Sequence, residues 1–214
     1  VNFLHKRDRK RPFFLVVGHV QTHSPWSGQP ERLVDRYRGC SFRDVPDGET
    51  YAFGIQNLES RDLIDRSRSE EALANYYAAV TAIDEGVGRL LDALHAEGAS
   101  DDTLIVYTSD HGLNCGHHGI WGKGNGTLPL NMVEESIRVP LILSGPRVTV
   151  QRRDEFVDHL DLFQTLMDFA GAPIEDPHDF SGRSYLALLA GARGVPWREV
   201  QFCEYGDVQM VRTK

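Results

Sequence analysis

Cysteine is scarce in this sequence and never occurs in a metal-binding or redox spacing. The three cysteines, Cys40, Cys115 and Cys203, form no Cys-x-x-Cys pair. Neither a disulfide framework nor a zinc ribbon is therefore predicted, and we interpret these residues as buried or incidental thiols.

Long apolar runs and an excess of positive charge are absent as well. No apolar run approaches the ~20 residues that a membrane-spanning helix needs. The formal net charge of -8 gives no general attraction to nucleic acid or to anionic lipid. We therefore predict no nucleic-acid or membrane partner, and an anionic small molecule would have to be held by local cations.

Apolar periodicity predicts both helices and strands. The clearest helix has apolar side chains at three- and four-residue steps, from a capping box at 67–70 to Gly98. Short apolar runs predict buried strands at 12–19, 103–109 and 137–145, and further spacing predicts helices at 159–173 and 185–190. The end of the chain predicts a hairpin of 198–206 with 208–214.

The order of these elements predicts an α/β fold with helices on the faces of a sheet. Residues 24–66 are rich in Pro, Gly, Asp and Arg and show no sustained period. We expect them to form a long, partly irregular connection, and connections of that length usually line a site.

Asp110 and His111 directly follow the predicted strand "TLIVYTS". Ligands of open α/β sheets gather at the carboxyl ends of strands. A carboxylate and an imidazole side by side can bind one divalent cation, although two ligands do not complete its shell. In the alternative interpretation, Asp110 caps the next turn and His111 hydrogen-bonds a carbonyl.

Five segments in order strengthen the functional interpretation. They are "PFFLVVGHVQTHSPW", "SDHG", "GHHGIWGK", "EESIRVPLILSGP" and "DLFQTLMDFAGAP". In order and approximate spacing they resemble the sulfatases of the alkaline phosphatase superfamily, and most closely the branch of choline sulfatases and phosphonate monoester hydrolases. The resemblance covers the chain from Pro12 to about Gly191.

The resemblance implies a role for five residues. Asp110 and His111 correspond to two metal ligands of the family. Lys123 corresponds to the lysine that contacts the sulfate or phosphonate group, and His23 to the histidine that shares this task. His118 is a weaker candidate for substrate contact.

A supporting role is expected for three charged residues that follow Lys123 in the chain. We interpret Glu134, Glu135 and Arg138 as bracing the site loop through ion pairs. They are not expected to react.

The resemblance also implies a fold and a cofactor. The fold would be part of an alkaline phosphatase-like sandwich, with a mixed, mainly parallel sheet and helices on both faces, over residues 1–194. Residues 195–214 would begin a small C-terminal antiparallel sheet. The metal would be Ca²⁺ by family, while the nitrogen ligand of His111 makes Mn²⁺ or a similar ion credible.

The chain departs from the family at the nucleophile. Family members carry a Cys or Ser, converted to formylglycine, in a Cys/Ser-x-Pro/Ala-x-Arg signature. Cys40-Ser-Phe-Arg43 lacks the Pro or Ala and places Arg one position early, so we reject Cys40. We expect the chain to be the C-terminal portion of a longer protein, inactive alone, with its formylglycine elsewhere.

Three functions remain open. The first is a sulfatase that cleaves a small-molecule sulfate ester, in which hydrated formylglycine attacks sulfur while Lys123 and His23 assist departure of the alcohol. The second is a phosphonate or phosphate diester hydrolase of the same superfamily. The third is a catalytically silent α/β binding module.

Overall fold

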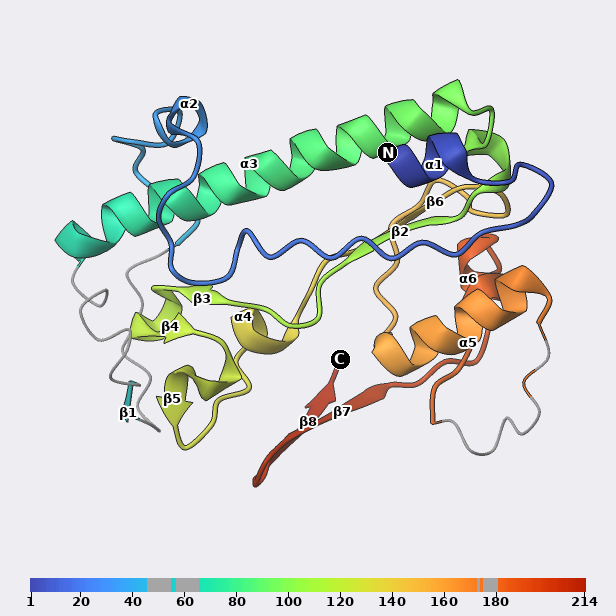
Figure 1. Ribbon diagram of the computed structural model, residues 1–214. Coiled ribbons are helices and arrows are strands. Elements are labelled where there is room, and N and C mark those ends of the chain that lie inside the picture. Colours follow the sequence, from blue (N-terminus) through green and yellow to red (C-terminus); the bar gives the residue numbers. More distant parts are fainter. Residues whose placement is uncertain (46–54, 57–65, 173, 175–180) are drawn as a thin grey trace. The chain divides into compact units, whose positions relative to one another are not determined.

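A computed structural model describes residues 1–45, 55–56, 66–172, 174 and 181–214 (Figure 1). These residues divide into two compact units. Unit 1 comprises Val1–Thr103, Thr108–Leu141 and Tyr205–Val208, and unit 2 comprises Leu104–Tyr107, Ile142–Glu204 and Gln209–Lys214. The longest helix of unit 1 is α3, and the longest of unit 2 is α5.

Helix α3, Arg66–Ala96, confirms the strongest helix prediction. Its buried side includes Leu73 and Ala78, both 0% exposed. Gly98 follows the last turn with φ +63°, a conformation that glycine adopts without strain. The predicted capping box is wrong, because the helix begins at Arg66 and Ser67 therefore lies inside it.

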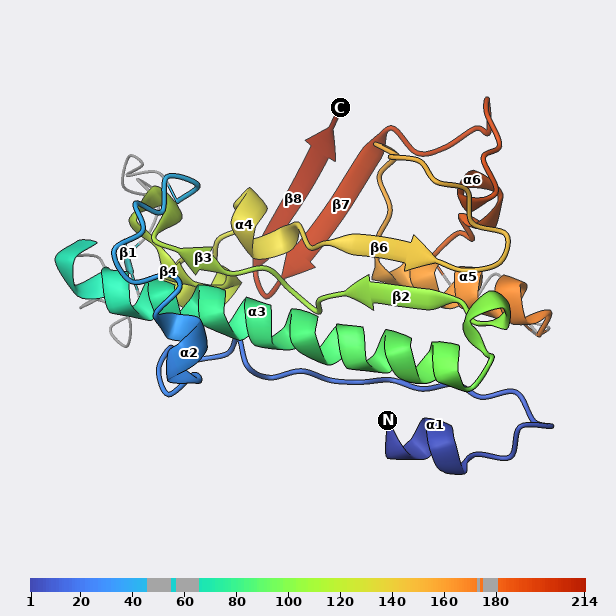
Figure 2. The same ribbon diagram turned by 90° about the horizontal axis from the view of Figure 1, so that it is seen from above.

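Two short helices, α1 (Asn2–Lys6) and α2 (Glu31–Val34), lie beside α3 in both views, and α2 crosses it (Figures 1 and 2). Helix α2 buries Leu33 and Val34, which are 0% and 1% exposed. Apolar burial of this kind stabilises the contact more than the exposed ion pairs that accompany it, because exposed pairs contribute little.

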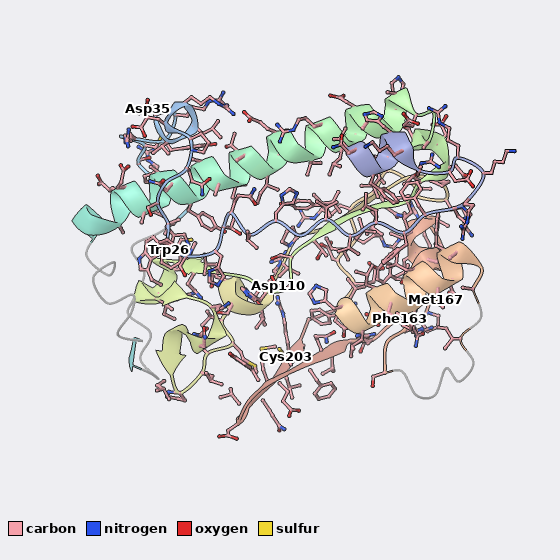
Figure 3. The ribbon with its side chains drawn as sticks, in the orientation of Figure 1. Trp26, Asp35, Asp110, Phe163, Met167 and Cys203 are labelled. Atoms are coloured by element: carbon pink, nitrogen blue, oxygen red, sulfur yellow. The ribbon has the colours of Figure 1, made fainter. Side chains whose placement is uncertain are left out.

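The core of unit 1 joins residues from α2, the segment that follows it, α3, and the strands β3 (Asn114–Cys115) and β4 (Trp121–Gly122). Its buried members are Leu33, Val34, Phe42, Val45, Ala72, Leu73, Ala74, Ala78, Cys115 and Trp121. Trp26 packs on Trp121 with ring centroids 5.2 Å apart, which ties residues near His23 to the strand that precedes Lys123. Figure 3 shows Trp26 close to this strand pair.

The predicted strand at 12–19 is wrong. This segment is extended but belongs to no strand, and Phe14 and Val16 are 77% and 75% exposed. A strand needs a neighbour for its backbone N–H and C=O groups. No strand in the described part of the chain pairs with these residues, so the apolar pattern alone does not produce a strand.

The segment between Gly112 and Ile137 is made of short elements. They are β3 (Asn114–Cys115), the 3-10 turn η3 (His117–Gly119), β4 (Trp121–Gly122), η4 (Gly124–Gly126), β5 (Thr127–Leu128) and α4 (Glu134–Ile137). Strands β3 and β4 pair antiparallel, and β5 pairs antiparallel with β1, Ile55–Gln56. A short 3-10 turn, η2 (Ser100–Asp102), precedes β2.

The predicted elements of the rest of the chain are confirmed. Strand β2 (Ile105–Thr108) pairs with β6 (Leu141–Ser144), which begins directly after Pro140. Unit 2 also contains α5 (His159–Ala170) and α6 (Leu186–Leu189). The hairpin consists of β7 (Val200–Tyr205) and β8 (Val208–Thr213).

Helix α5 begins with a feature that its apolar spacing does not reveal. Asp158 accepts a hydrogen bond from the backbone of Asp161, and the Asp161 side chain accepts one from the backbone of Asp158. This reciprocal capping satisfies two N–H groups that have no partner inside the helix. Figure 3 labels Phe163 and Met167, one turn apart on α5.

The α/β fold class is confirmed, with helices and strands interleaved along the chain. In the described ranges the strands form four two-stranded sheets. The same residues include no helix long and apolar enough to cross a membrane.

We predict that Leu73→Ala lowers the free energy of unfolding by about 2–5 kcal/mol, because it leaves a cavity in the core of unit 1. Leu91→Ala on the same helix is the matched control, since Leu91 is 42% exposed. Chemical denaturation of both variants of the full-length protein measures the difference. Equal losses at the two positions would contradict the assigned core.

Candidate metal and anion site

Asp110 and His111 lie in the turn that directly follows β2. The Asp110 carboxylate accepts a hydrogen bond from the backbone N–H of His111 at 3.0 Å, and Ser109 Oγ donates to the His111 carbonyl at 2.9 Å. Asp110 lies near α4 in Figure 3. The turn is therefore held by its own polar groups, and the second carboxylate oxygen of Asp110, Oδ2, lies 3.5 Å from His111 Nε2.

The hydrogen bonds of His111 define which ring nitrogen can act as a ligand. Nδ1 lies 2.9 Å from the Gly112 carbonyl oxygen, which can only accept, so Nδ1 carries the hydrogen. Nε2 then presents a lone pair. Lys123 Nζ donates to this lone pair at 3.1 Å.

The Asp110 carboxylate is in its charged form at neutral pH. Partial burial acts to raise the pKa of Asp110, but the electrostatic effect of the adjacent His111 and the hydrogen bonds from backbone N–H groups and Ser109 outweigh burial, and the pKa is lowered. The side chain is 84% exposed. An ionised, accessible carboxylate is the form that binds a cation.

The spacing of the two side chains fits one divalent cation. Asp110 Oδ2 and His111 Nε2 are 3.5 Å apart. Two ligands that lie about 2.4 Å from one Ca²⁺ at a right angle are separated by about 3.4 Å. The donor set and its separation therefore suit a metal, with further ligands required from outside the pair. Among the residues that the structure describes, no group of three His, Cys, Asp or Glu side chains could hold a metal.

Lys123 follows β4 directly and precedes the turn η4. Gly122 has φ +121°, and a Cβ at this position would lie 3.3 Å from the Gly126 Cα. The tight turn therefore requires glycine before the lysine. It directs the Lys123 ammonium to His111, twelve residues earlier in the chain.

His23 lies on the N-terminal segment. Its Nδ1 is 2.9 Å from the Ser24 carbonyl oxygen. Trp26 links the segment to β4 through Trp121. No described hydrogen bond or ion pair joins His23 to Lys123, so the predicted role of His23 in binding the anion stays a prediction.

His118 lies in the 3-10 turn η3 with φ +55°. Its Nε2 is 3.0 Å from Glu135 Oε2. Glu135 thus contacts the site loop through an ion pair, in the manner expected of it. Glu134 lies 3.7 Å from Arg138, four residues later in the chain.

The backbone of α4 presses against the turn that carries the metal pair. The Gly112 N–H donates to the Ser136 carbonyl at 2.9 Å. A Cβ on Gly112 would lie 2.0 Å from the Glu135 carbonyl oxygen, far inside contact distance. Only glycine permits this approach, which explains the residue that follows the Asp-His pair.

None of the three cysteines has the setting of a nucleophile. Cys40 is exposed, and its thiol donates to the Arg36 carbonyl. Cys115 is 3% exposed, and burial raises its pKa to about 12. Cys203 lies in the β7 strand. The raised pKa of the buried Cys115 thiol does not fit a thiolate nucleophile. None of the three cysteines lies in the Cys-x-Pro/Ala-x-Arg signature of a formylglycine precursor.

Three polar residues near Lys123 were not singled out from the sequence. Asn114, Asn131 and Ser136 are 0%, 1% and 4% exposed and hydrogen-bond to one another. Each belongs to a short element or a loop, where no apolar period marks the buried positions. Sequence reasoning had no signal that could identify them.

Known proteins resemble this chain over most of its length. A family model described as Sulfatase matches residues 1–172. An arylsulfatase of Clostridium perfringens is 30% identical over 210 residues, which are 93% of this chain and 42% of that protein. A choline-sulfatase of Rhizobium meliloti is 29% identical over 92% of this chain and 39% of its own.

A solved structure shows the same likeness in three dimensions. The phosphonate monoester hydrolase of Silicibacter pomeroyi aligns with a TM-score of 0.57 and 30% identity, over 63% of this chain and 25% of its own. The chain spans about two fifths of the length of the two curated relatives above.

We predict that Gly112→Ala lowers the free energy of unfolding by about 1–3 kcal/mol, because the added methyl group displaces α4. Gly88→Ala on α3 is the matched control, since its Cβ would meet nothing within 4 Å. In a helix interior this change should stabilise by about 0.5–1 kcal/mol. Denaturant unfolding measures both, and a stabilising Gly112→Ala would refute the close contact.

Proposed function

Because the chain belongs to the sulfatase family, we propose that the full-length protein hydrolyses the ester bond of a sulfated small molecule. One observation carries the proposal. Lys123 Nζ lies 3.1 Å from His111 Nε2, which lies 3.5 Å from the Asp110 carboxylate. A cation-binding pair and the positive charge of the Lys123 ammonium therefore meet at the end of β2.

Sulfate ester hydrolysis gives these groups their roles. Attack at sulfur builds negative charge on the non-bridging oxygens and on the departing alkoxide. The Lys123 ammonium, a compact positive charge with three donors, stabilises the charge on the non-bridging oxygens. The overall charge of the chain is -8, so binding of the anion depends on such local cations.

Asp110 and His111 would hold the divalent metal, Ca²⁺ by family or Mn²⁺ given the nitrogen ligand. When bound, the metal acts as a Lewis acid that neutralises charge on the sulfuryl oxygens. The Nδ1–H bond to the Gly112 carbonyl orients the His111 ring, so that Nε2 is the ligating atom.

His23 and His118 are assigned to the substrate with different support. His23 is proposed as a donor or general acid towards the leaving alcohol, since a histidine can supply a proton near neutral pH. His118 is the weaker contact, because Glu135 already takes its Nε2.

The nucleophile is proposed to lie outside these 214 residues, as a formylglycine. Its absence here is supported by the surroundings of Cys40, Cys115 and Cys203. We also propose that residues 195–214 begin a small C-terminal antiparallel subdomain, in line with the β7–β8 hairpin. The remaining residues would then belong to the catalytic domain.

A phosphonate or phosphate diester is the second candidate substrate. The likeness to the phosphonate monoester hydrolase of Silicibacter pomeroyi favours it. A tetrahedral phosphorus centre presents the same type of anionic oxygen to Lys123, so the described residues serve either ester.

The metal assignment predicts that Asp110→Ala lowers the metal content of the purified full-length protein, because one of its two ligands from this chain is lost. Elemental analysis measures the content per protein. Asp101→Ala, at an exposed aspartate of η2, is the control and should retain the metal. Unchanged content in Asp110→Ala would refute the site.

The anion assignment predicts that Lys123→Ala lowers kcat/KM by about 10²–10³-fold, the usual effect of removing one oxyanion donor. Aryl sulfate and aryl phosphonate esters are compared on the same protein, and the faster ester identifies the substrate class. Lys10→Ala, at an exposed lysine, should leave the rate unchanged. Failure of the full-length protein to hydrolyse either ester would contradict the proposal and favour a binding module.

A further inference from the structure

A buried chain of polar side chains lies beneath Lys123. It consists of Asn114 on β3, Ser136 on α4 and Asn131 on the loop between β5 and α4, and we call it the buried polar triad. Asn114 Nδ2 donates to Ser136 Oγ at 2.8 Å, and Ser136 Oγ donates to Asn131 Oδ1 at 2.6 Å. The residues are 0%, 4% and 1% exposed.

The direction of every bond in the triad is fixed. Asn114 Nδ2 also donates to the Gly122 carbonyl at 3.1 Å, which can only accept. The Ser136 hydroxyl therefore receives one hydrogen and gives its own to Asn131. Asn131 Nδ2 must then face the carbonyl groups on its other side, and no amide can turn over without losing bonds.

The triad holds the backbone on both sides of Lys123. Asn131 Nδ2 lies 3.2 Å from the Lys123 carbonyl oxygen and 3.3 Å from that of Gly124. The backbone N–H of Asn131 donates to Gly124 at 2.9 Å. Together with the Asn114 bond to Gly122, three successive carbonyl groups are held in place.

Ser136 also holds the other half of the site. Its backbone carbonyl accepts the N–H of Gly112 at 2.9 Å, one residue after His111. Ser136 is thus bonded through its backbone carbonyl to the turn that carries Asp110 and His111. Through its hydroxyl it is bonded to the other two residues of the triad, Asn114 and Asn131. The spacing between His111 and Lys123 depends on this shared contact.

Burying these groups is costly unless each has a partner. Asn114 Oδ1 is buried and has no partner within the described residues, so its amide contributes through its donor side. An apolar residue would fill the same space without that penalty. It would remove the side-chain donors to the carbonyl groups of Gly122 and Lys123, and the Lys123 carbonyl would keep the bond from the Gly126 N–H at 2.7 Å.

We propose that Asn114, Ser136 and Asn131 are positioning residues for catalysis, which set the place of the Lys123 ammonium relative to His111. The inference rests on the proposed role of Lys123 in binding the anion. The three side chains of the triad are placed to act through the backbone of residues 122–124, while the Ser136 carbonyl holds Gly112 and is retained in each variant. Removing a side chain of the triad should therefore lower sulfate affinity and the rate of hydrolysis only while Lys123 is present.

A double-mutant cycle with inorganic sulfate as the probe tests this dependence. Isothermal titration of the full-length protein gives the sulfate affinity, and kcat/KM for an aryl ester is measured in parallel. Asn131→Ala should weaken both by about 10–100-fold, because small misplacements near the reacting groups cost up to about 10²-fold. In the Lys123→Ala background, the same change should alter either quantity by less than about threefold.

The controls separate positioning from folding. Asn75→Ala on α3 removes another buried amide, which bonds the Glu71 carbonyl of the same helix and the backbone N–H of Gln29, and should lower stability without changing sulfate affinity. Should Asn131→Ala fail to fold, Ser136→Ala takes its place in the cycle, since it removes one hydroxyl and retains the Asn131 amide.

The outcomes distinguish this inference from the function on which it rests. The positioning role alone would be overturned if Asn131→Ala lowered sulfate affinity and kcat/KM equally in both backgrounds. It would also be overturned if Asn131→Ala lowered them in neither background while Lys123→Ala abolished sulfate binding. Unchanged sulfate affinity and rate in Lys123→Ala would overturn the proposed function itself. A loss that vanishes without Lys123 supports both.

Discussion

The bonds of Ser136 are the constraint on which the candidate site depends. They join a turn after β2 to a turn after β4, two segments that have no ladder between them. Helix α4, Glu134–Ile137, is too short to be stable alone, since isolated helices need many more residues. The helix and the two turns therefore stabilise one another, and none of the three would keep its place independently.

The site combines rigid backbone with accessible side chains. Gly112 and the carbonyl groups around Lys123 are held by contacts at or below 3.3 Å. Asp110 is 84% exposed and His111 40% exposed in their side chains. The hydrogen bonds hold the backbone, while the side chains of Asp110 and His111 stay accessible to solvent. This arrangement suits the binding of a small charged ligand, because the groups are oriented before the ligand arrives.

Much of the fold could be predicted from local pattern. Helices α3 and α5 and strands β2 and β6 follow from their apolar patterns, and Gly98 ends α3 as expected. The apolar run around Phe14 shows the limit of such reasoning. A β-strand forms only where a second strand accepts and donates its backbone hydrogen bonds, and the apolar pattern of one segment does not say whether that second strand is present.

The residues of the site likewise divide into those that could be identified from the sequence and those that could not. Asp110, His111 and Lys123 could be identified because their types and order resemble a known family. Asn114 and Asn131 could not, because a polar residue in a loop is usually exposed, and burial here results from contacts between distant short elements. The Glu135 contact was expected as an ion pair, but its partner His118 was assigned to substrate.

The lone pair of His111 Nε2 has room for one positively charged partner at a time. The described structure gives that place to the side-chain nitrogen of residue 123. A cation held at Nε2 would take the place of this hydrogen bond, and the Lys123 ammonium would then be free to bind an anion. Binding of a cation at His111 and binding of an anion at Lys123 would thereby be coupled through the lone pair of Nε2.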